Sequence, residues 1–205
     1  MHSSALLPSL RRGLAAAGLL LAAGAAFAAE PRSLFNGRDL AGWSGNPAFW
    51  SVRDGAITGR TTAENPLKAN TFIVWQGGEV ADFELRLKFR LVADNDKNFA
   101  NSGVQYRSKL LDPAAWVVGG YQADMDAANQ YTGMLYEERG RGILVRPGEH
   151  IRIGPAGANG KPTLEPIGPA GDPAAIRAAI KAGDWNELVI VARGNQVRHS
   201  INGQV

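Results

Sequence analysis

Hydrophobic and polar residues alternate strictly between residues 83 and 91. Phe83, Leu85, Leu87, Phe89 and Leu91 are apolar, and every residue between them is charged. A period of two places the apolar side chains on one face of a strand and the charged ones on the other. The pattern therefore predicts a strand that covers a core with one face and meets solvent with the other.

Other short apolar segments follow along the chain, separated by turn residues such as Asp54-Gly55 and Gly119-Gly120. The run at 188–192 is apolar throughout, which is typical of a strand buried on both faces. A turn at 193–195 joins it to the next segment as a hairpin. The further strands predicted are 49–53, 71–75, 102–107, 120–125, 132–137, 142–145, 150–153, 188–192 and 196–201.

Only one helix is predicted, over residues 173–182. Asp172 can cap its first turn, Pro173 suits its first position, and Gly183 follows its end. Residues 154–171 are rich in Gly, Pro and Ala, and we expect them to form a long surface loop. Many short strands with one helix favour a single-domain sandwich or jelly roll.

The first residues have the pattern of a secretory signal. Arg11 and Arg12 precede an apolar run at residues 14–27, and small residues precede a cleavage site after Ala28. We therefore expect residues 1–28 to be a signal peptide, residues 29–205 to form the mature domain, and the protein to be periplasmic or secreted. An uncleaved anchor is the alternative, and the arginine pair also hints at export of a folded protein.

The composition excludes several classes of protein. The 205 residues contain no cysteine, which excludes thiolate metal centres, disulfide scaffolds and a cysteine nucleophile. Without Arg11 and Arg12 the Lys+Arg count falls from 22 to 20 against 19 Asp+Glu, so the mature chain is nearly neutral. Such a balance does not indicate a nucleic-acid surface. No later segment is long and apolar enough to span a membrane.

The last residues predict a turn without its second strand. Asn202-Gly203 is typical of a two-residue hairpin turn, and only Gln204 and Val205 follow it. We therefore expect a further C-terminal strand to be missing. One edge of the sheet would then lack its partner.

Polar side chains gather on two of the predicted strands. In NSGVQYRS, Asn101, Gln105 and Arg107 share one parity and therefore one face. Amides and a guanidinium on one face can bind adjacent sugar hydroxyls or a carboxylate. An ordinary solvated face is the alternative.

In GGYQADMD, Gln122, Asp124 and Asp126 also share a face. Carboxylates two residues apart on a strand lie ~6–7 Å apart at the backbone. They can divide acid and base roles if their environments separate their pKa values. They could instead bind calcium together with Asn129, or form an exposed acidic edge.

A third polar group, in TGMLYEERGRG, lies at a strand end. Glu137 and Glu138 point to opposite faces, so at most one of them lines a given groove, and we favour Glu137. The other is expected to form a surface ion pair with Arg139 or Arg141.

His199 and two tryptophans are further candidates. His199 shares parity with Val197 and Ile201, which favours a core histidine over a catalytic one. Trp75 and Trp116 border predicted loops and are candidate platforms for a sugar ring. No serine lies in a nucleophile elbow, and no glycine loop has the spacing that binds phosphate.

Seven segments occur in the order that is typical of one known family: SLFNGRDLAGW, FWSVRDGAITG, DFELRLKFRL, NSGVQYRS, GGYQADM, TGMLYEERGRG and DWNELVIVARGNQVRHSINGQ. Over residues 32–205 the chain resembles the 3-keto-disaccharide hydrolase domain family. The resemblance implies an all-β jelly-roll β-sandwich of two antiparallel sheets, of the concanavalin A-like lectin and glucanase type, with one short helix. Many members carry a GYE segment where this chain has Gln122 and Asp124.

The resemblance implies an exported hydrolase of 3-keto-glycosides. A ketone at carbon 3 acidifies the hydrogen at carbon 2, so a base can remove it, the aglycone can be eliminated, and water can add. Direct displacement by two carboxylates is the rival mechanism. On the elimination hypothesis the candidates are a general base, Asp124; an acid, Glu137 or His199; an enolate-stabilising donor, Arg107 or Tyr136; and substrate contacts, Asn101, Gln105, Gln122 and Trp75.

The expected partner is an oxidised disaccharide or glycoside, with no nucleic acid, and no membrane after signal cleavage. No resident cofactor is expected, although a divalent cation such as calcium could bind the oxygen-rich groups. The oligomeric state stays open. The alternative functions are a non-catalytic carbohydrate-binding, lectin-like module and a structural domain of the cell envelope.

Overall fold

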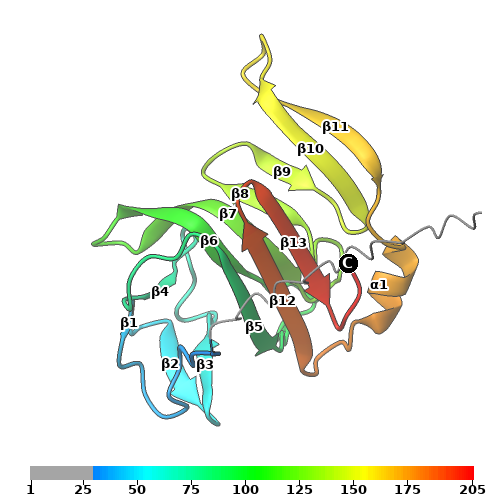
Figure 1. Cartoon of the computed structure of the whole chain (residues 1–205). Helices are drawn as coiled ribbons and strands as arrows, with labels where there is room; N and C mark the ends of the chain where they lie inside the picture. Colours follow the sequence, from blue (N-terminus) through cyan, green and yellow to red (C-terminus); the bar gives the residue numbers. More distant parts are fainter. Residues whose placement is uncertain (1–29) are drawn as a thin grey trace, which may run out of the picture. The chain divides into compact units, whose positions relative to one another are not determined.

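The computed structural model describes residues 30–205, so the predicted signal peptide at residues 1–28 lies outside the described residues. Residues Leu34–Val205 form one compact unit. Figure 1 shows that this unit is built almost entirely of strands, as predicted. The fold is an all-β jelly-roll sandwich of antiparallel sheets with one short helix. The elements are β1 (Trp43–Gly45), β2 (Trp50–Arg53), β3 (Ala56–Gly59), β4 (Ile73–Trp75), β5 (Phe83–Phe89), β6 (Asn101–Asp112), β7 (Val117–Asp126), β8 (Leu135–Glu138), β9 (Gly142–Val145), β10 (Glu149–Ala156), β11 (Pro162–Pro169), α1 (Pro173–Ala179), β12 (Asn186–Arg193) and β13 (Gln196–Ile201).

Two sheets form the sandwich, one with the order β13-β12-β5 and the other with the order β6-β7-β8-β9. In β5 the charged residues are exposed and the apolar ones face inward, as the alternation predicts. The centre of β12 is buried, as its apolar run predicts. The core lies between the two sheets and consists of Phe89, Leu188, Ile190 and Ile201 from one, and Tyr106, Ala123, Met125, Leu135 and Leu144 from the other.

The prediction of a long surface loop at residues 154–171 is wrong. Most of this segment belongs to β10 and β11, which pair with each other as an antiparallel hairpin. Figure 1 shows β10 and β11 side by side as a two-stranded ribbon. Their backbones pair although Gly and Pro interrupt the alternation that marks a strand in sequence, and two register shifts accommodate the irregularity.

The predicted helix is present but shorter, because α1 ends at Ala179. Asp172 caps it as expected, with Oδ1 accepting a hydrogen bond from the Ala174 amide at 2.8 Å. Ile180 then takes an extended conformation and ends the helix. Within residues 30–205 no helix combines the length and apolar character needed to cross a membrane.

Strands β6 and β7 form a hairpin that is longer than either prediction. A bulge at Arg107 and Ser108 interrupts the pairing, and Arg107 has a φ of 48°. Opposite the bulge lies Gly120, where a side chain would collide with Ser108. The bulge changes the face on which later side chains lie. The residues after it therefore do not continue the period-two alternation that predicts a strand.

Candidate functional site

Two neighbouring rows of side chains cross β6, β7 and β8. In one row Gln105 lies opposite Gln122, and Gln122 lies opposite Tyr136. The adjacent row consists of Tyr106, Tyr121 and Glu137. Because successive residues of a strand point to opposite faces, the two rows lie on opposite sides of the sheet.

The predicted site residues therefore divide between two faces. Tyr106 belongs to the core between the sheets, so its row, which ends in Glu137, lies on the core face. The other side of the sheet is called the polar face here. It carries five of the predicted residues, namely Asn101, Gln105, Gln122, Asp124 and Tyr136.

Hydrogen bonds link the side chains of the polar face into an amide ladder that leads to Asp124. Ser108 Oγ donates to Gln105 Oε1 at 2.8 Å, and Gln105 Nε2 donates to Gln122 Oε1 at 2.9 Å. Gln122 Nε2 in turn donates to Asp124 Oδ1 at 3.2 Å. Asn101 Nδ2 reaches the same Asp124 oxygen at 3.3 Å. Asn101 and Gln105 of β6 thus share one network with Gln122 and Asp124 of β7. Arg107 and Asp126, which were predicted on the same faces, make other hydrogen bonds.

Gly103 makes room for this network. It lies directly opposite Asp124 in the register. A Cβ atom at this position would lie only 2.5 Å from Cδ of Gln122. The absence of a side chain therefore lets Gln122 lie across β6, where Gln105 can hold it.

Asp124 is buried, with 5% of the residue exposed. Its Oδ1 accepts hydrogen bonds from Gln122, Asn101 and the Met125 amide. Among residues 30–205, Oδ2 accepts none. Burial raises the pKa of Asp124 to about 6, although the hydrogen bonds act in the opposite direction. The carboxylate is therefore ionised at neutral pH and is a stronger base than an ordinary aspartate.

Asp126 organises the loop that follows β7. Its carboxylate accepts hydrogen bonds from the backbone amides of Gln130, Tyr131 and Thr132 at 3.1, 2.8 and 3.1 Å. Both of its oxygens are used in these bonds, which gives Asp126 a structural role. Within the described part of the chain no three His, Asp or Glu side chains are grouped to hold a metal ion.

Glu137 is held by Arg141 at the β8–β9 turn. The Arg141 amide donates to Glu137 Oε2 at 2.8 Å, and Arg141 Nη2 donates to Oε1 at 3.0 Å. The hydrogen bonds from the Arg141 side chain lower the pKa of Glu137. Arg141 also reaches the Tyr121 hydroxyl, at 3.3 Å. Glu137 is thus an ionised partner of an arginine on the core face, away from the amide ladder.

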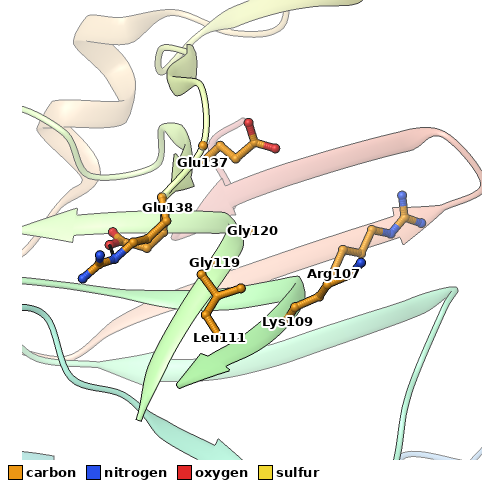
Figure 2. A pocket seen from close by; sticks show the side chains of 9 residues that line it. Arg107, Lys109, Leu111, Gly119, Gly120, Glu137 and Glu138 are labelled. Carbon is orange, nitrogen blue, oxygen red and sulfur yellow. Dashed lines mark ion pairs between the residues drawn. The ribbon is translucent and has the colours of Figure 1, made fainter. Parts of the chain in front are cut away.

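A hollow of ≈ 270 Å³ lies around the β6 bulge and the end of β8. Figure 2 shows Glu137 and Glu138 pointing apart at this strand end, as their parity predicts. Arg107 also lines the hollow and donates to the Ala81 carbonyl at 3.3 Å. Glu138 has the parity of the polar face, is buried, and accepts from Asn70 Nδ2 at 3.1 Å. The hollow brings Arg107 and Glu137 together, whereas Asp124 is not part of its lining.

His199 lies on the core side and bridges the two sheets. Its Nδ1 lies 3.3 Å from the Gly133 carbonyl oxygen and its Nε2 lies 2.8 Å from the Tyr106 hydroxyl. Since a carbonyl can only accept, Nδ1 carries the hydrogen and Tyr106 donates to Nε2. Burial lowers the pKa of His199 to about 4 and raises that of Tyr106. The ring is therefore neutral at neutral pH, as suits a satisfied core histidine.

The Gly133 peptide connects His199 to the backbone of Asp124. The Gly133 amide donates to the Asp124 carbonyl at 2.9 Å, and the Asp124 amide donates to the Met134 carbonyl at 3.1 Å. His199 thus holds, from the opposite sheet, the segment that pairs with Asp124. The sequence pattern identified His199 as a core residue but carried no sign of this link, because Gly133 and His199 are far apart in the chain.

The tryptophans lie outside the amide ladder. Trp75 lies on β4, opposite Trp43 of β1, in a separate two-stranded sheet, and its ring covers Gly77. Trp116 donates through Nε1 to Ser44 Oγ at 3.0 Å and fastens the β6–β7 turn to β1. Neither contact brings an indole ring next to Asp124.

The described residues match the model of a known protein family. A family model described as 3-keto-alpha-glucoside-1,2-lyase-like domain matches residues 30–205. The match includes every strand of both sheets and the whole amide ladder. It confirms the resemblance that the ordered sequence segments indicate. No curated protein matches the chain.

Proposed function

The chain belongs to the family of 3-keto-alpha-glucoside-1,2-lyase-like domains, and we propose that it cleaves the glycosidic bond of a 3-keto-glycoside by elimination across carbons 1 and 2, followed by hydration. Membership supports a glycosidase-like role, and the family description favours elimination over direct displacement. The observation that carries the proposal is Asp124, a buried carboxylate with a raised pKa at the end of an amide ladder. The signal-peptide pattern of residues 1–28 supports a periplasmic or extracellular location for this reaction.

In the first step Asp124 acts as the general base. Its Oδ2 takes the proton from carbon 2, and the electron pair of that bond forms an enolate between carbons 2 and 3, with the negative charge on the carbon 3 oxygen. A base with a pKa near the working pH is both ionised and strong enough for such a transfer. Three hydrogen bonds to Oδ1 hold the carboxylate in place and leave Oδ2 for the substrate.

In the second step the enolate collapses. The carbon 3 carbonyl forms again, a double bond forms between carbons 1 and 2, and the bond from carbon 1 to the aglycone oxygen breaks. The departing oxygen takes a proton from water. The hydroxide left by that water then adds to carbon 1, and Asp124 returns its proton to carbon 2, which regenerates the carboxylate and releases the 3-keto sugar.

Donors on the polar face support the negative charge of the enolate. Tyr136 lies opposite Gln122 and provides a phenolic hydroxyl for the carbon 3 oxygen. Asn101, Gln105 and Gln122 offer amide groups to the sugar hydroxyls. Glu137 and His199 are left out of this scheme as acids, because Glu137 is ionised beside Arg141 and His199 is neutral and bonded at both ring nitrogens.

The test is release of reducing sugar from 3-keto-trehalose by the full chain, with unoxidised trehalose as the control substrate and with EDTA in a parallel sample. We expect release from the keto sugar alone. Asp124→Asn should lower the rate by roughly 10²–10⁴-fold, because the amide cannot accept the proton. The matched control is Asp54→Asn, which changes an exposed carboxylate in the β2–β3 turn and should leave the rate unchanged.

Wild-type turnover by folded Asp124→Asn would remove Asp124 from the mechanism. Saturable sugar binding by the wild type without turnover would instead favour the lectin-like function. Loss of activity with EDTA would show that a divalent cation takes part.

A further inference from the structure

Phe99 stands out among the apolar residues of the described chain. It is 71% exposed, the highest value among the exposed large hydrophobic residues. It lies two residues before Asn101, whose amide holds the Asp124 carboxylate. Its ring is therefore accessible to a ligand that binds near the start of β6.

The backbone at Phe99 is held firmly by a single side chain. The Phe99 amide donates to Asn95 Oδ1 at 3.0 Å, and Asn95 Nδ2 donates to the Phe99 carbonyl at 2.7 Å. The Asn98 amide donates to the Asn95 carbonyl at 3.1 Å, and Asn98 has a φ of 48°, so the turn between them is tight. Phe99 is therefore presented from an ordered turn.

The register places Phe99 at the Asp124 end of the polar face. The Ala127 amide donates to the Ala100 carbonyl at 2.9 Å, which continues the β6–β7 pairing one residue beyond Asn101 and Asp126. Phe99 thus immediately precedes Ala100, the residue that continues the pairing at the start of β6. Its position is next to the part of the polar face where Asn101 meets Asp124.

A second aromatic residue comes from the other side of β7. Tyr131 is 39% exposed, and its amide donates to Oδ1 of the buried Asp126 at 2.8 Å. Asp126 is the residue paired with Asn101 at the end of β7. Phe99 and Tyr131 therefore stand before β6 and after β7 at the same end of the sheet, each on a turn organised by one Asn or Asp side chain.

We infer that Phe99, assisted by Tyr131, is an aromatic platform that holds the oxidised sugar ring beside Asp124. A pyranose ring presents C–H groups on its faces and hydroxyls around its rim. Aromatic surface for the C–H groups and amides for the hydroxyls are the two kinds of contact that such a ligand needs. The inference rests on the proposed function and adds an aromatic residue that contacts the sugar ring.

The experiment measures equilibrium binding of 3-keto-trehalose by titration calorimetry, in the full chain carrying Asp124→Asn so that turnover does not consume the ligand. Adding Phe99→Ala should weaken binding by about tenfold or more, because the stacking surface is lost. Adding Phe99→Trp should keep the affinity within about threefold. Adding Tyr131→Ala should have a smaller effect than Phe99→Ala, in the same direction.

The matched control is Val92→Ala, because Val92 is 66% exposed and lies in the same loop but carries no ring. We expect it to leave the affinity within about twofold. Since Phe99 is exposed, Phe99→Ala should leave the unfolding temperature unchanged, which separates a binding effect from misfolding. Unchanged affinity in folded Phe99→Ala overturns the platform, and so does an equal loss with Val92→Ala.

The failure of the platform and the failure of the proposed reaction give different results. If the wild type turns over the keto sugar and Phe99→Ala binds it normally, only the platform is wrong. If the wild type does not turn over the keto sugar but binding depends on Phe99, the platform holds and only the proposed reaction is wrong.

Discussion

The two faces of the β6-β7-β8 sheet shift the pKa values of their carboxylates in opposite directions. On the polar face, Asp124 is buried among amides and its pKa is raised to about 6, while Oδ2 has no hydrogen bond within residues 30–205. On the core face, Glu137 is bound by Arg141 and its pKa is lowered. His199, on the same side, is neutral and bonded at both ring nitrogens.

The difference shows how the partners of a carboxylate set its affinity for a proton. Both carboxylates are partly or fully removed from water, yet only Asp124 lacks a cationic partner among the described residues. Neutral amides orient the Asp124 carboxylate without neutralising it, so it keeps its affinity for a proton. The Arg141 guanidinium instead stabilises the negative charge of Glu137 and so lowers its affinity for a proton.

The largest expected effect is the pH dependence of the reaction rate, which tests the difference between Asp124 and Glu137 directly. Asp124 must be ionised to act as a base, so kcat/KM on 3-keto-trehalose should be constant above about pH 6 and fall about tenfold per unit below it. At about pH 4 the rate should be about 100-fold below its value on the plateau. A rate profile that stays flat down to about pH 4 would contradict the role of Asp124. Circular dichroism at each pH checks that the chain remains folded.

The stability of the two regions should depend on pH with opposite sign. His199 has a pKa of about 4 in the folded chain, below its ordinary value near 6.5, so the unfolded chain takes up its proton first and stability is lost as the pH falls through this window. Asp124 has a raised pKa, so the folded chain takes up its proton first and stability is gained as the pH falls. In the wild type the two contributions partly cancel.

When the Asp124 contribution to the pH dependence of stability is removed, the His199 contribution should become measurable. We expect Asp124→Asn to lose about 3 kcal/mol of unfolding free energy through His199 as the pH falls from about 7 to about 4. Adding His199→Gln should remove that part of the loss, and the difference between the single and double variants isolates it from other carboxylates. Urea unfolding at several pH values measures both. Parallel curves for the two variants would show that His199 is not buried neutral.

The smallest expected effect is that of replacing Glu137, which we expect to have a structural role only. Glu137→Gln removes the charge that Arg141 binds at the β8–β9 turn, which should cost about 0–1 kcal/mol, as for other partly exposed ion pairs. Activity on the keto sugar should stay within about twofold of the wild type. A loss of about 100-fold in a folded variant would restore Glu137 as the general acid.

Sequence patterns predicted most of the sandwich because its strands alternate or are uniformly apolar. β5, β12, β13 and the cap of α1 agree with the prediction, since each depends on neighbouring residues in the chain. The β10–β11 hairpin was predicted as a loop, because backbone pairing holds it together while Gly and Pro conceal the pattern. The bulge at Arg107 was not predicted either, because the hydrophobic pattern of the sequence carries no sign of the positive φ at this residue.

The amide ladder was predictable only in part. The parity of Asn101 and Gln105, and that of Gln122 and Asp124, follows from the alternation within each strand. That the two pairs share one network follows from the β6–β7 register, in which Gly103 leaves space for Gln122. The roles of Ser108 and Gly103 have no signal of their own in the sequence.

Sequence patterns alone predicted the all-β class, the apolar face of the alternating strands, the opposite orientation of Glu137 and Glu138, and the family. These features depend on the order of side chains along a strand, and a strand alternates wherever it lies. The tertiary structure was needed to show which carboxylate has a raised pKa and which a lowered one. The pKa of Asp124 depends on burial and on amides from β6, and that of His199 depends on the opposite sheet. Such environments arise from contacts between distant segments, which no local pattern encodes.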